Sequence, residues 1–338
     1  MKEKSPLVSI KCLVFNHEPY LRQCLDGFVM QKTTFCFEAI VHDDASTDNS
    51  AAIIREYAEK YPDIIKPIYE TENQYSKKDG SLSRIMNQAC RGKYIAICEG
   101  DDYWIDPLKL QKQVSFLETH PDYTMCVTEA KVLAPDNSYW EWQTYKEDCE
   151  MPTSTIISRG MHFIQTCTYV YRYSVYDDWP TVNNQCCVGD FPLFITCALK
   201  GKVYYLSCRT GVYRKCYNND SWNSRINKYS IEQRIALEKN IADTFLGLND
   251  YSHGKYRLDF YYAVAYLVYN LVNKYPQHAK LIINSILPGP NRKEVLSTLN
   301  KSQLLNHWLW RYRLNAIFKV KHFLASNLYK LKSNLSCM

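Results

Sequence analysis

The chain has 338 residues, of which 46% are hydrophobic and 22% are charged. With only 11 Gly and 13 Pro, this composition excludes collagen-like, low-complexity and largely disordered proteins and leaves an ordered globular chain of about two domains. The formal charge of +6 comes from the end of the chain, where seven Lys and Arg and no acidic residue follow Glu294. The preceding part is near neutral, which argues against a nucleic-acid partner.

The first 130 residues alternate between strand-like and helix-like patterns. Apolar, β-branched runs and amphipathic stripes follow one another at residues 8–15, 21–29, 37–42, 51–61, 64–69, 82–89, 94–98 and 110–117. This alternation predicts right-handed crossovers and an α/β fold with a Rossmann-like, mostly parallel sheet covered by helices on both faces.

The pattern changes near residue 230 to helical stripes that are rich in Tyr. We therefore predict an N-terminal α/β domain over residues 1–225 and a helical C-terminal region over residues 226–338. Residues 304–332 combine basic and aromatic side chains, for which two interpretations stay open. They form either a helix lying on an anionic membrane surface or a helix docked on the protein with its cations in solvent.

The 14 Cys fall mostly in apolar stretches and no CxxC pair occurs, which favours core packing over zinc binding. Residues 1–6 lead into a strand-like run without a secretory segment, and the longest apolar stretch, at residues 260–272, is too short to span a bilayer. These features predict a cytoplasmic protein with reduced thiols, either free or peripheral on the inner face of the membrane.

Polar residues follow the predicted strands at their carboxyl ends, where open parallel sheets bind ligands. They are Asn16, Asp43, Asp44, Glu99, Asp101 and Asp102. Carboxylates gathered at one edge repel one another, and Mn²⁺ or Mg²⁺ would relieve the repulsion while holding phosphate oxygens. We predict such a metal at Asp101 and Asp102; the alternative is that both are turn residues.

Three segments together resemble a known family. They are residues 8–17 with Phe15-Asn16-His17, residues 42–48 (His-Asp-Asp-Ala-Ser-Thr-Asp), and Glu99-Gly100-Asp101-Asp102 with Pro107. In this order and spacing they are similar to the family 2 glycosyltransferases with a GT-A fold, over roughly residues 5–220. The resemblance implies an inverting, metal-dependent hexosyltransferase. Such an enzyme moves a sugar from a nucleotide sugar, here a UDP-sugar, to a hydroxyl of a glycan or lipid-linked acceptor in bacterial cell-surface polysaccharide synthesis.

The resemblance also implies residue roles. Phe15 lies near the nucleobase, with Asn16 in the same nucleotide-binding segment, and Asp44 accepts a hydrogen bond from a uracil-type imide. Asp101 lies near the ribose or the metal, and Asp102 is the metal ligand at the diphosphate. Two positions depart from the usual family form: Glu99 replaces Asp, so its role stays open, and Ala45 replaces Gly, which demands a less permissive backbone.

The general base implied by the resemblance is Asp190, at the start of a predicted helix; the alternative is that it only caps that helix. Arg214 and Lys215 are implied cationic donors to the diphosphate, or else a solvated pair at a strand end. Arg159 and His162 bind acceptor or face water.

Two other functions stay open at this point. A nucleotidyltransferase would need a Gly-rich phosphate loop after the first strand, which residues 13–17 do not provide. A catalytically inactive nucleotide-sugar-binding protein would have no need of Asp190.

Overall fold

The structure is a computed structural model that describes residues 5–141, 144–160, 163–215, 222–287, 289 and 291–299. It divides into two compact units between residues 288 and 289. The first unit contains a ten-stranded sheet and most of the helices, and the second contains α11 (Arg292–Leu299).

The N-terminal half of the sheet is parallel, as predicted. Its strands are β1 (Val8–Val14), β2 (Phe37–Asp43), β3 (Ile65–Tyr69) and β4 (Tyr94–Ile97), in the spatial order β3-β2-β1-β4. All three pairings are parallel, so the carboxyl ends of β1, β2 and β4 lie at one edge. Each strand begins and ends within one residue of its predicted bounds.

The other half of the sheet is mixed. It contains β5 (Tyr103–Trp104), β6 (Tyr123–Leu133), β7 (Tyr139–Glu141), β8 (Cys149–Met151), β9 (Val170–Arg172) and β10 (Lys202–Arg214). Strands β6 and β10 are parallel to each other, whereas β9 joins β4 to β6 by antiparallel pairing. Antiparallel pairing also attaches β5 and β8 to β10 and β7 to β6. The α/β architecture is therefore confirmed, with antiparallel strands inserted after β4.

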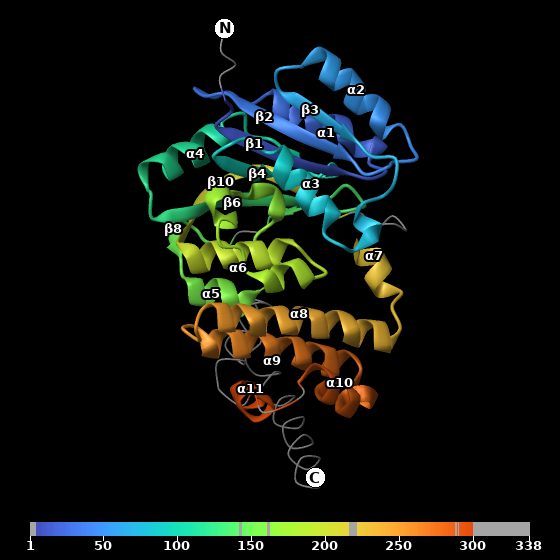
Figure 1. The fold of residues 1–338 in the computed structure, drawn as a ribbon, viewed down its shortest axis with the longest axis vertical. Helices are drawn as coiled ribbons and strands as arrows, with labels where there is room; N and C mark the ends of the chain where they lie inside the picture. Colours follow the sequence, from blue (N-terminus) through green and yellow to red (C-terminus); the bar gives the residue numbers. More distant parts are fainter. Residues whose placement is uncertain are drawn as a thin grey trace. The chain divides into compact units, whose positions relative to one another are not determined.

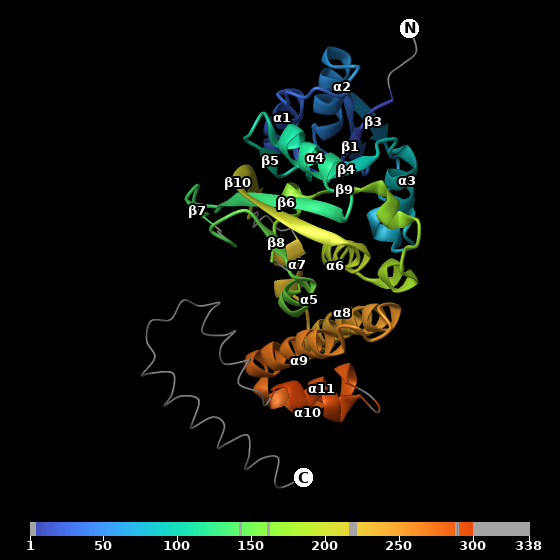
Figure 2. The same ribbon diagram turned by 90° about the vertical axis from the view of Figure 1, so that its left-hand side faces the viewer.

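Helices cover both sides of the sheet (Figure 2). On one side lie α1 (Glu18–Val29), α2 (Ser50–Lys60) and α4 (Lys109–Thr119), and on the other lie α5 (Thr153–Arg159) and α6 (Asp190–Lys200). The alternate apolar residues of β1, such as Ile10 and Cys12, are buried in one core with Leu25 and Phe28 of α1. Full burial of such side chains contributes roughly 1.5–3 kcal/mol each.

The remaining helices are α3 (Ser81–Ala89), α7 (Trp222–Asn227), α8 (Ile231–Tyr251), α9 (Arg257–Lys274) and α10 (Ala279–Ile286), with short 3-10 turns at Tyr75–Lys77, Thr166–Thr168, Tyr173–Tyr176, Thr181–Gln185 and Pro276–His278. Helix α8 begins with a capping box between Ser230 and Gln233 and runs beneath α6, where Phe191 stacks on Phe245 with ring centroids 5.0 Å apart (Figure 1).

The sheet and the helices α8 to α10 thus belong to one compact unit, and the domain boundary at residue 225 stays a prediction. Within the residues that the structure describes, no helix is both long and apolar enough to cross a membrane. Residues 304–332, for which membrane contact is predicted, lie outside the described residues.

Candidate active site

The candidate site lies at the edge where β1, β2 and β4 end. Backbone hydrogen bonds tie the three strand ends together: the Asp44 amide donates to the Val14 carbonyl at 2.9 Å, and the Gly100 amide donates to the Leu13 carbonyl at 2.9 Å. The polar residues that follow each strand are therefore brought to one place, as the strand order requires.

The acidic turn, residues 99–102, follows β4 directly. The Asp102 amide donates to the Glu99 carbonyl at 3.0 Å and closes the turn. A Cβ added at Gly100 would lie 2.7 Å from His17 Nδ1, so only glycine lets the turn pack this closely against the end of β1. Three carboxylates are thus held within four residues of one rigid strand end.

Asp102 is buried, with 4% of its surface exposed, whereas Asp101 is partly buried. Asp102 Oδ1 accepts a hydrogen bond from the Arg214 amide at 2.8 Å, and the Cys167 thiol donates a second one. Burial, with the nearby charge of Asp101, raises the pKa of the Asp102 carboxyl well above its ordinary value. The charged form of Asp102 is therefore disfavoured unless a cation lies beside it.

Glu99, whose role the sequence left open, links the acidic turn to Asp190. The residue is exposed, but the protein around its carboxyl desolvates it, and this desolvation together with the charges of Asp101 and Asp190 raises the pKa of Glu99 to about 8. Asp190 therefore lies within electrostatic reach of the turn, although the two are far apart in the sequence.

Asp190 is the first residue of α6 and is partly buried. Its Oδ1 accepts a hydrogen bond from the Phe191 amide at 2.8 Å, and the positive end of the helix dipole favours its negative charge. Gly189 is the N-cap residue of α6, and Asp190 is the first residue inside the helix. Its carboxylate stands at a helix start that the buried Phe191 and Leu193 anchor to the core.

Asp44 is buried and holds the segment that follows β3. Its two carboxylate oxygens accept from the Gln74 amide at 2.6 Å and the Tyr75 amide at 3.0 Å. Phe15, at the neighbouring strand end, leaves 41% of its surface exposed, so its ring is accessible to a ligand. The neighbouring ends of β1 and β2 thus carry an exposed aromatic ring and a buried carboxylate.

Asn16 and Ala45 shape the loops at these strand ends. Asn16 Oδ1 accepts from the Thr47 amide at 2.7 Å, so its side chain joins the ends of β1 and β2. Asn16 and Ala45 both have left-handed backbone conformations, with φ of 55° and 61°. The strain expected at Ala45 is therefore present, because a Cβ disfavours this region.

Replacing Ala45 with glycine is expected to raise the free energy of unfolding by about 0.5–1 kcal/mol, since relief of about 1–2 kcal/mol of left-handed strain exceeds the entropy that glycine loses on folding. Denaturant unfolding measures the change. Ala58→Gly, inside α2, is the control and should lower stability by about 1 kcal/mol. Equal losses in both variants would contradict the strain at Ala45.

Arg214 reaches the acidic turn from the end of β10. Its Nε donates to the Asp101 carbonyl at 2.9 Å, one terminal nitrogen donates to Gln23 Oε1 at 2.9 Å, and the guanidinium lies 4.6 Å from the centre of the Tyr20 ring. Lys215 does not join it: Lys215 Nζ lies 4.8 Å from the centre of the Trp140 ring. Of the two predicted cations, the structure brings only Arg214 to the turn.

A sequence model of the family described as glycosyl transferase family 2 matches residues 9–179, half of the chain. The chain belongs to glycosyl transferase family 2. The matched range contains β1, β2, β4 and the acidic turn, which are the elements that build the edge.

The chain is similar to the uncharacterised protein Rv1520 of Mycobacterium tuberculosis, with 38% identity over 221 residues. These cover 64% of the chain and 61% of Rv1520, so the chain matches about three fifths of that relative's length. EpsE of Bacillus subtilis, named provisionally as a glycosyltransferase, is 28% identical over 249 residues, which cover 73% of the chain and 86% of EpsE.

The solved structure of residues 1–349 of TarS from S. aureus in complex with UDP-GlcNAc is similar to this family 2 chain, with a TM-score of 0.56 at 16% identity. The match covers 86% of this chain and 87% of TarS. A second TarS structure, in complex with UDP, has a TM-score of 0.54 over 82% of the chain. The likeness confirms the GT-A fold.

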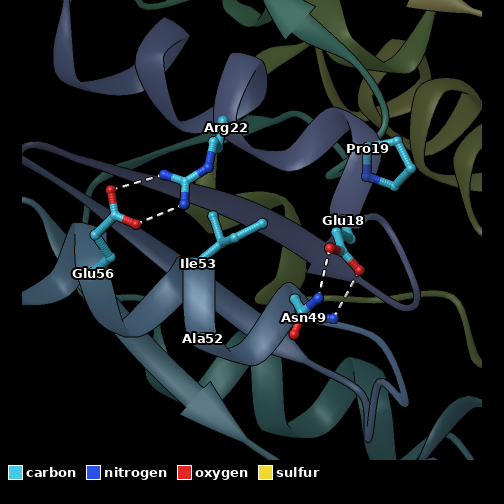
Figure 3. A pocket seen from close by; sticks show the side chains of 7 residues that line it. All are labelled: Glu18, Pro19, Arg22, Asn49, Ala52, Ile53 and Glu56. Carbon is cyan, nitrogen blue, oxygen red and sulfur yellow. Dashed lines mark hydrogen bonds and ion pairs between the residues drawn. The ribbon is translucent and has the colours of Figure 1, made fainter.

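A hollow in the described protein lies away from this edge. A space of about 570 Å³ lies between α1 and α2 (Figure 3). Its polar side chains already pair with one another: Arg22 with Glu56 at 2.6 Å, and Glu18 with Asn49 at 2.6 Å. Because these groups are satisfied by each other, the hollow offers few free polar groups to a ligand, and the acidic edge remains the candidate site.

Some predicted residues of the family 2 site are placed differently or not described. Arg159 lies against Phe163, with its guanidinium 4.6 Å from the ring centre. His162 and residues 216–221 lie outside the described residues. Among the residues that are described, no three His, Cys, Asp or Glu side chains form a ready metal cluster.

Proposed function

We propose that the chain is an inverting, metal-dependent glycosyltransferase of the hexosyl type. It would move a sugar from a UDP-sugar to a hydroxyl group of a glycan or lipid-linked acceptor in cell-surface polysaccharide synthesis. The observation that carries this proposal is the acidic turn at the carboxyl end of β4 with Asp190 within electrostatic reach of Glu99. This arrangement brings a candidate base near a candidate diphosphate site.

Asp190 is the proposed general base. It accepts the proton of the acceptor hydroxyl while the acceptor oxygen bonds to the anomeric carbon and the bond from that carbon to the diphosphate breaks. A single displacement of this kind inverts the anomeric carbon. Asp190 is the first residue of α6 and its Oδ1 accepts from the Phe191 amide, so its carboxylate is positioned before the acceptor binds.

Arg214 is the proposed cationic donor to the leaving diphosphate. Its backbone is bonded to Asp102 and its Nε to the Asp101 carbonyl, so part of its guanidinium is already committed to shaping the turn. One terminal nitrogen donates to Gln23, which is exposed, so this nitrogen is the one we propose to turn to the diphosphate. A donor fixed before the reaction stabilises the charge that develops on the phosphate.

The residues of the acidic turn fit a divalent cation. Mg²⁺ is usually held by one or two carboxylates and completes its shell with phosphate oxygens and water, so a three-residue cluster is not required. Asp101 and Asp102 would hold the ion, and a cation there would offset the cost of ionising the buried Asp102 carboxyl, whose pKa burial and the charge of Asp101 raise. When bound, Mn²⁺ or Mg²⁺ would neutralise the diphosphate.

The nucleotide is proposed to lie against Phe15, Asn16 and Asp44. An exposed ring at one strand end and a buried carboxylate at the next suit stacking and hydrogen bonding by a base. The TarS structures in complex with UDP and UDP-GlcNAc, which share the fold, support uridine as the base. Contact with a membrane through residues 304–332 remains part of the proposal.

Thermal unfolding tests the nucleotide and metal assignments together. A ligand that binds only the folded state at a hundred times its Kd adds about 2.7 kcal/mol of stability, so UDP with Mn²⁺ should raise Tm by several degrees. UDP with EDTA should raise it little. GDP with Mn²⁺ is the control for the base, and UMP with Mn²⁺ for the diphosphate. An unchanged Tm with UDP and Mn²⁺ would overturn the proposal.

A further inference from the structure

Two consecutive cysteines, Cys186 and Cys187, precede the helix that carries Asp190. Seven of the described cysteines are buried, but Cys186 is only partly buried and Cys187 is exposed. The two residues are consecutive in the chain, and neither thiol is fully buried. No role in the proposed reaction accounts for this pair.

The loop that carries the pair is held by α8. Asn240 Oδ1 accepts from the Cys187 amide at 2.8 Å, and Asn240 Nδ2 donates to the Gln185 carbonyl at 2.8 Å. One side chain thus fixes the backbone on both sides of Cys186. Asp190 follows Cys187 by only three residues, so the backbone that Asn240 holds leads directly into the start of α6.

The two sulfur atoms differ in reactivity. The neighbouring Cys187 thiol, with smaller contributions from the Thr244 hydroxyl and the Val188 amide, outweighs burial and lowers the pKa of the Cys186 thiol to about 7. The same thiol pairing, together with burial, raises the pKa of Cys187. The thiolate is the nucleophilic form of cysteine. Cys186 therefore has the character of an attacking thiol, with Cys187 beside it as its protonated partner.

We propose that Cys186 and Cys187 form a dithiol modification site that disulfide oxidants close into a vicinal disulfide. The Cys186 thiolate attacks a small-molecule disulfide and releases one thiolate. Cys187 then gives up its proton and attacks the Cys186 sulfur, which releases the second thiolate. Two protein thiols are oxidised and one external disulfide is reduced to two thiols.

Geometry makes this bond reversible. Consecutive Cα atoms are about 3.8 Å apart, below the usual 4.4–6.8 Å of disulfide-linked residues, so the closed ring is strained and easily reduced. An exposed and strained disulfide is typical of regulatory rather than structural pairs. The site therefore responds to the balance of thiols and disulfides around the protein.

Closure is expected to reduce sugar transfer, a consequence that rests on the proposed function. A ring at residues 186–187 changes the backbone whose amide bonds to Asn240, and the change is passed to Asp190 at the start of α6. A displacement of about 1 Å at a reacting group costs about 10²-fold in rate. We expect an inhibition of that order, restored by a dithiol reductant.

The experiment treats the full chain with glutathione disulfide, and separately with phenylarsine oxide, which bridges two thiols. Expected results are the loss of two hydrogen atoms, or one arsenical, on the peptide that contains both cysteines, and reversal by dithiothreitol. Cys186→Ser and Cys187→Ser should each abolish the bridge, and Cys36→Ser, which removes an exposed thiol far from α6 in the sequence, should leave it intact.

Mass measurements decide the site, and transfer rates decide its effect. The site is overturned if the reagents modify Cys36 and leave Cys186 and Cys187 unmodified, or if the single serine variants still bind the arsenical in the same peptide. The effect on Asp190 is overturned if the closed protein transfers sugar at the rate of the reduced one. Because the mass readout needs no activity, failure of the proposed function would leave the site itself tested.

Discussion

Replacing Asp190 with asparagine is expected to lower the rate of sugar transfer by about 10²–10⁴-fold, the usual contribution of a positioned general base. The amide keeps an oxygen that can accept from the Phe191 amide, so the start of α6 should be preserved. An amide cannot take the proton of the acceptor hydroxyl, so kcat should fall while the fold is unchanged. Initial rates with a UDP-sugar measure the loss, and the Tm confirms the fold.

Two comparisons make this result specific. Asp243→Asn removes an exposed carboxylate of α8 that pairs with Lys239 and should transfer sugar at the rate of the unchanged protein. The Asp190→Asn variant should still gain Tm from UDP and Mn²⁺, because Asp190 is not among the residues proposed to bind the nucleotide. Transfer at the original rate by Asp190→Asn would remove Asp190 from the mechanism.

The strand ends could be predicted because each depends on local pattern. Residues 8–15 and 37–42 are apolar, β-branched runs that stop at polar residues, and β1 and β2 end within one residue of the predicted positions. Once the strands are parallel, their carboxyl ends share an edge. The shared edge of Phe15, Asp44 and Asp101 could therefore be predicted from the alternating strand and helix pattern, whereas the order of the strands comes from the structure.

The contacts that join the two halves of the sheet could not be predicted in this way. The bond between Asp102 and the Arg214 amide spans 112 positions and depends on β5, a strand of two residues that pairs Tyr103 with Val212. A strand this short has no periodicity to detect. The link between Glu99 and Asp190 likewise depends on β9 and α6, whose placement is set by tertiary packing.

The different placement of Arg214 and Lys215 could have been predicted from the sequence. Arg214 is the last residue of β10, and successive residues of a strand point to opposite faces. Arg214 and Lys215 could therefore not both reach the same turn if the strand continued through them. The structure places Arg214 against the turn and Lys215 against Trp140, in agreement with this rule.

Replacing Asp102 with asparagine is expected to remove the requirement for metal in UDP binding and to lower sugar transfer by at least 10²-fold, while making the metal-free protein more stable. Asp102 is buried, and its pKa is raised well above the ordinary 3.8. In EDTA the unfolded chain therefore releases this proton at a lower pH than the folded chain, and the folded state loses stability as the pH rises from that value toward the raised pKa. Asparagine carries no such proton and can still accept from the Arg214 amide.

The Tm advantage of Asp102→Asn in EDTA should consequently be larger at neutral than at acidic pH, and thermal unfolding at both measures it. The matched control is Asp106→Asn, on the same loop, where the carboxylate accepts from the Leu108 amide at 2.9 Å and pairs with Lys112 at the surface. It should keep both transfer and the response to Mn²⁺, because asparagine can still accept from the Leu108 amide and the lost partner, Lys112, is exposed to solvent. If Asp102→Asn instead transferred sugar at the original rate and still needed Mn²⁺ to bind UDP, the buried carboxylate would have only a structural role, and the ion would have to be held by Asp101 and Glu99.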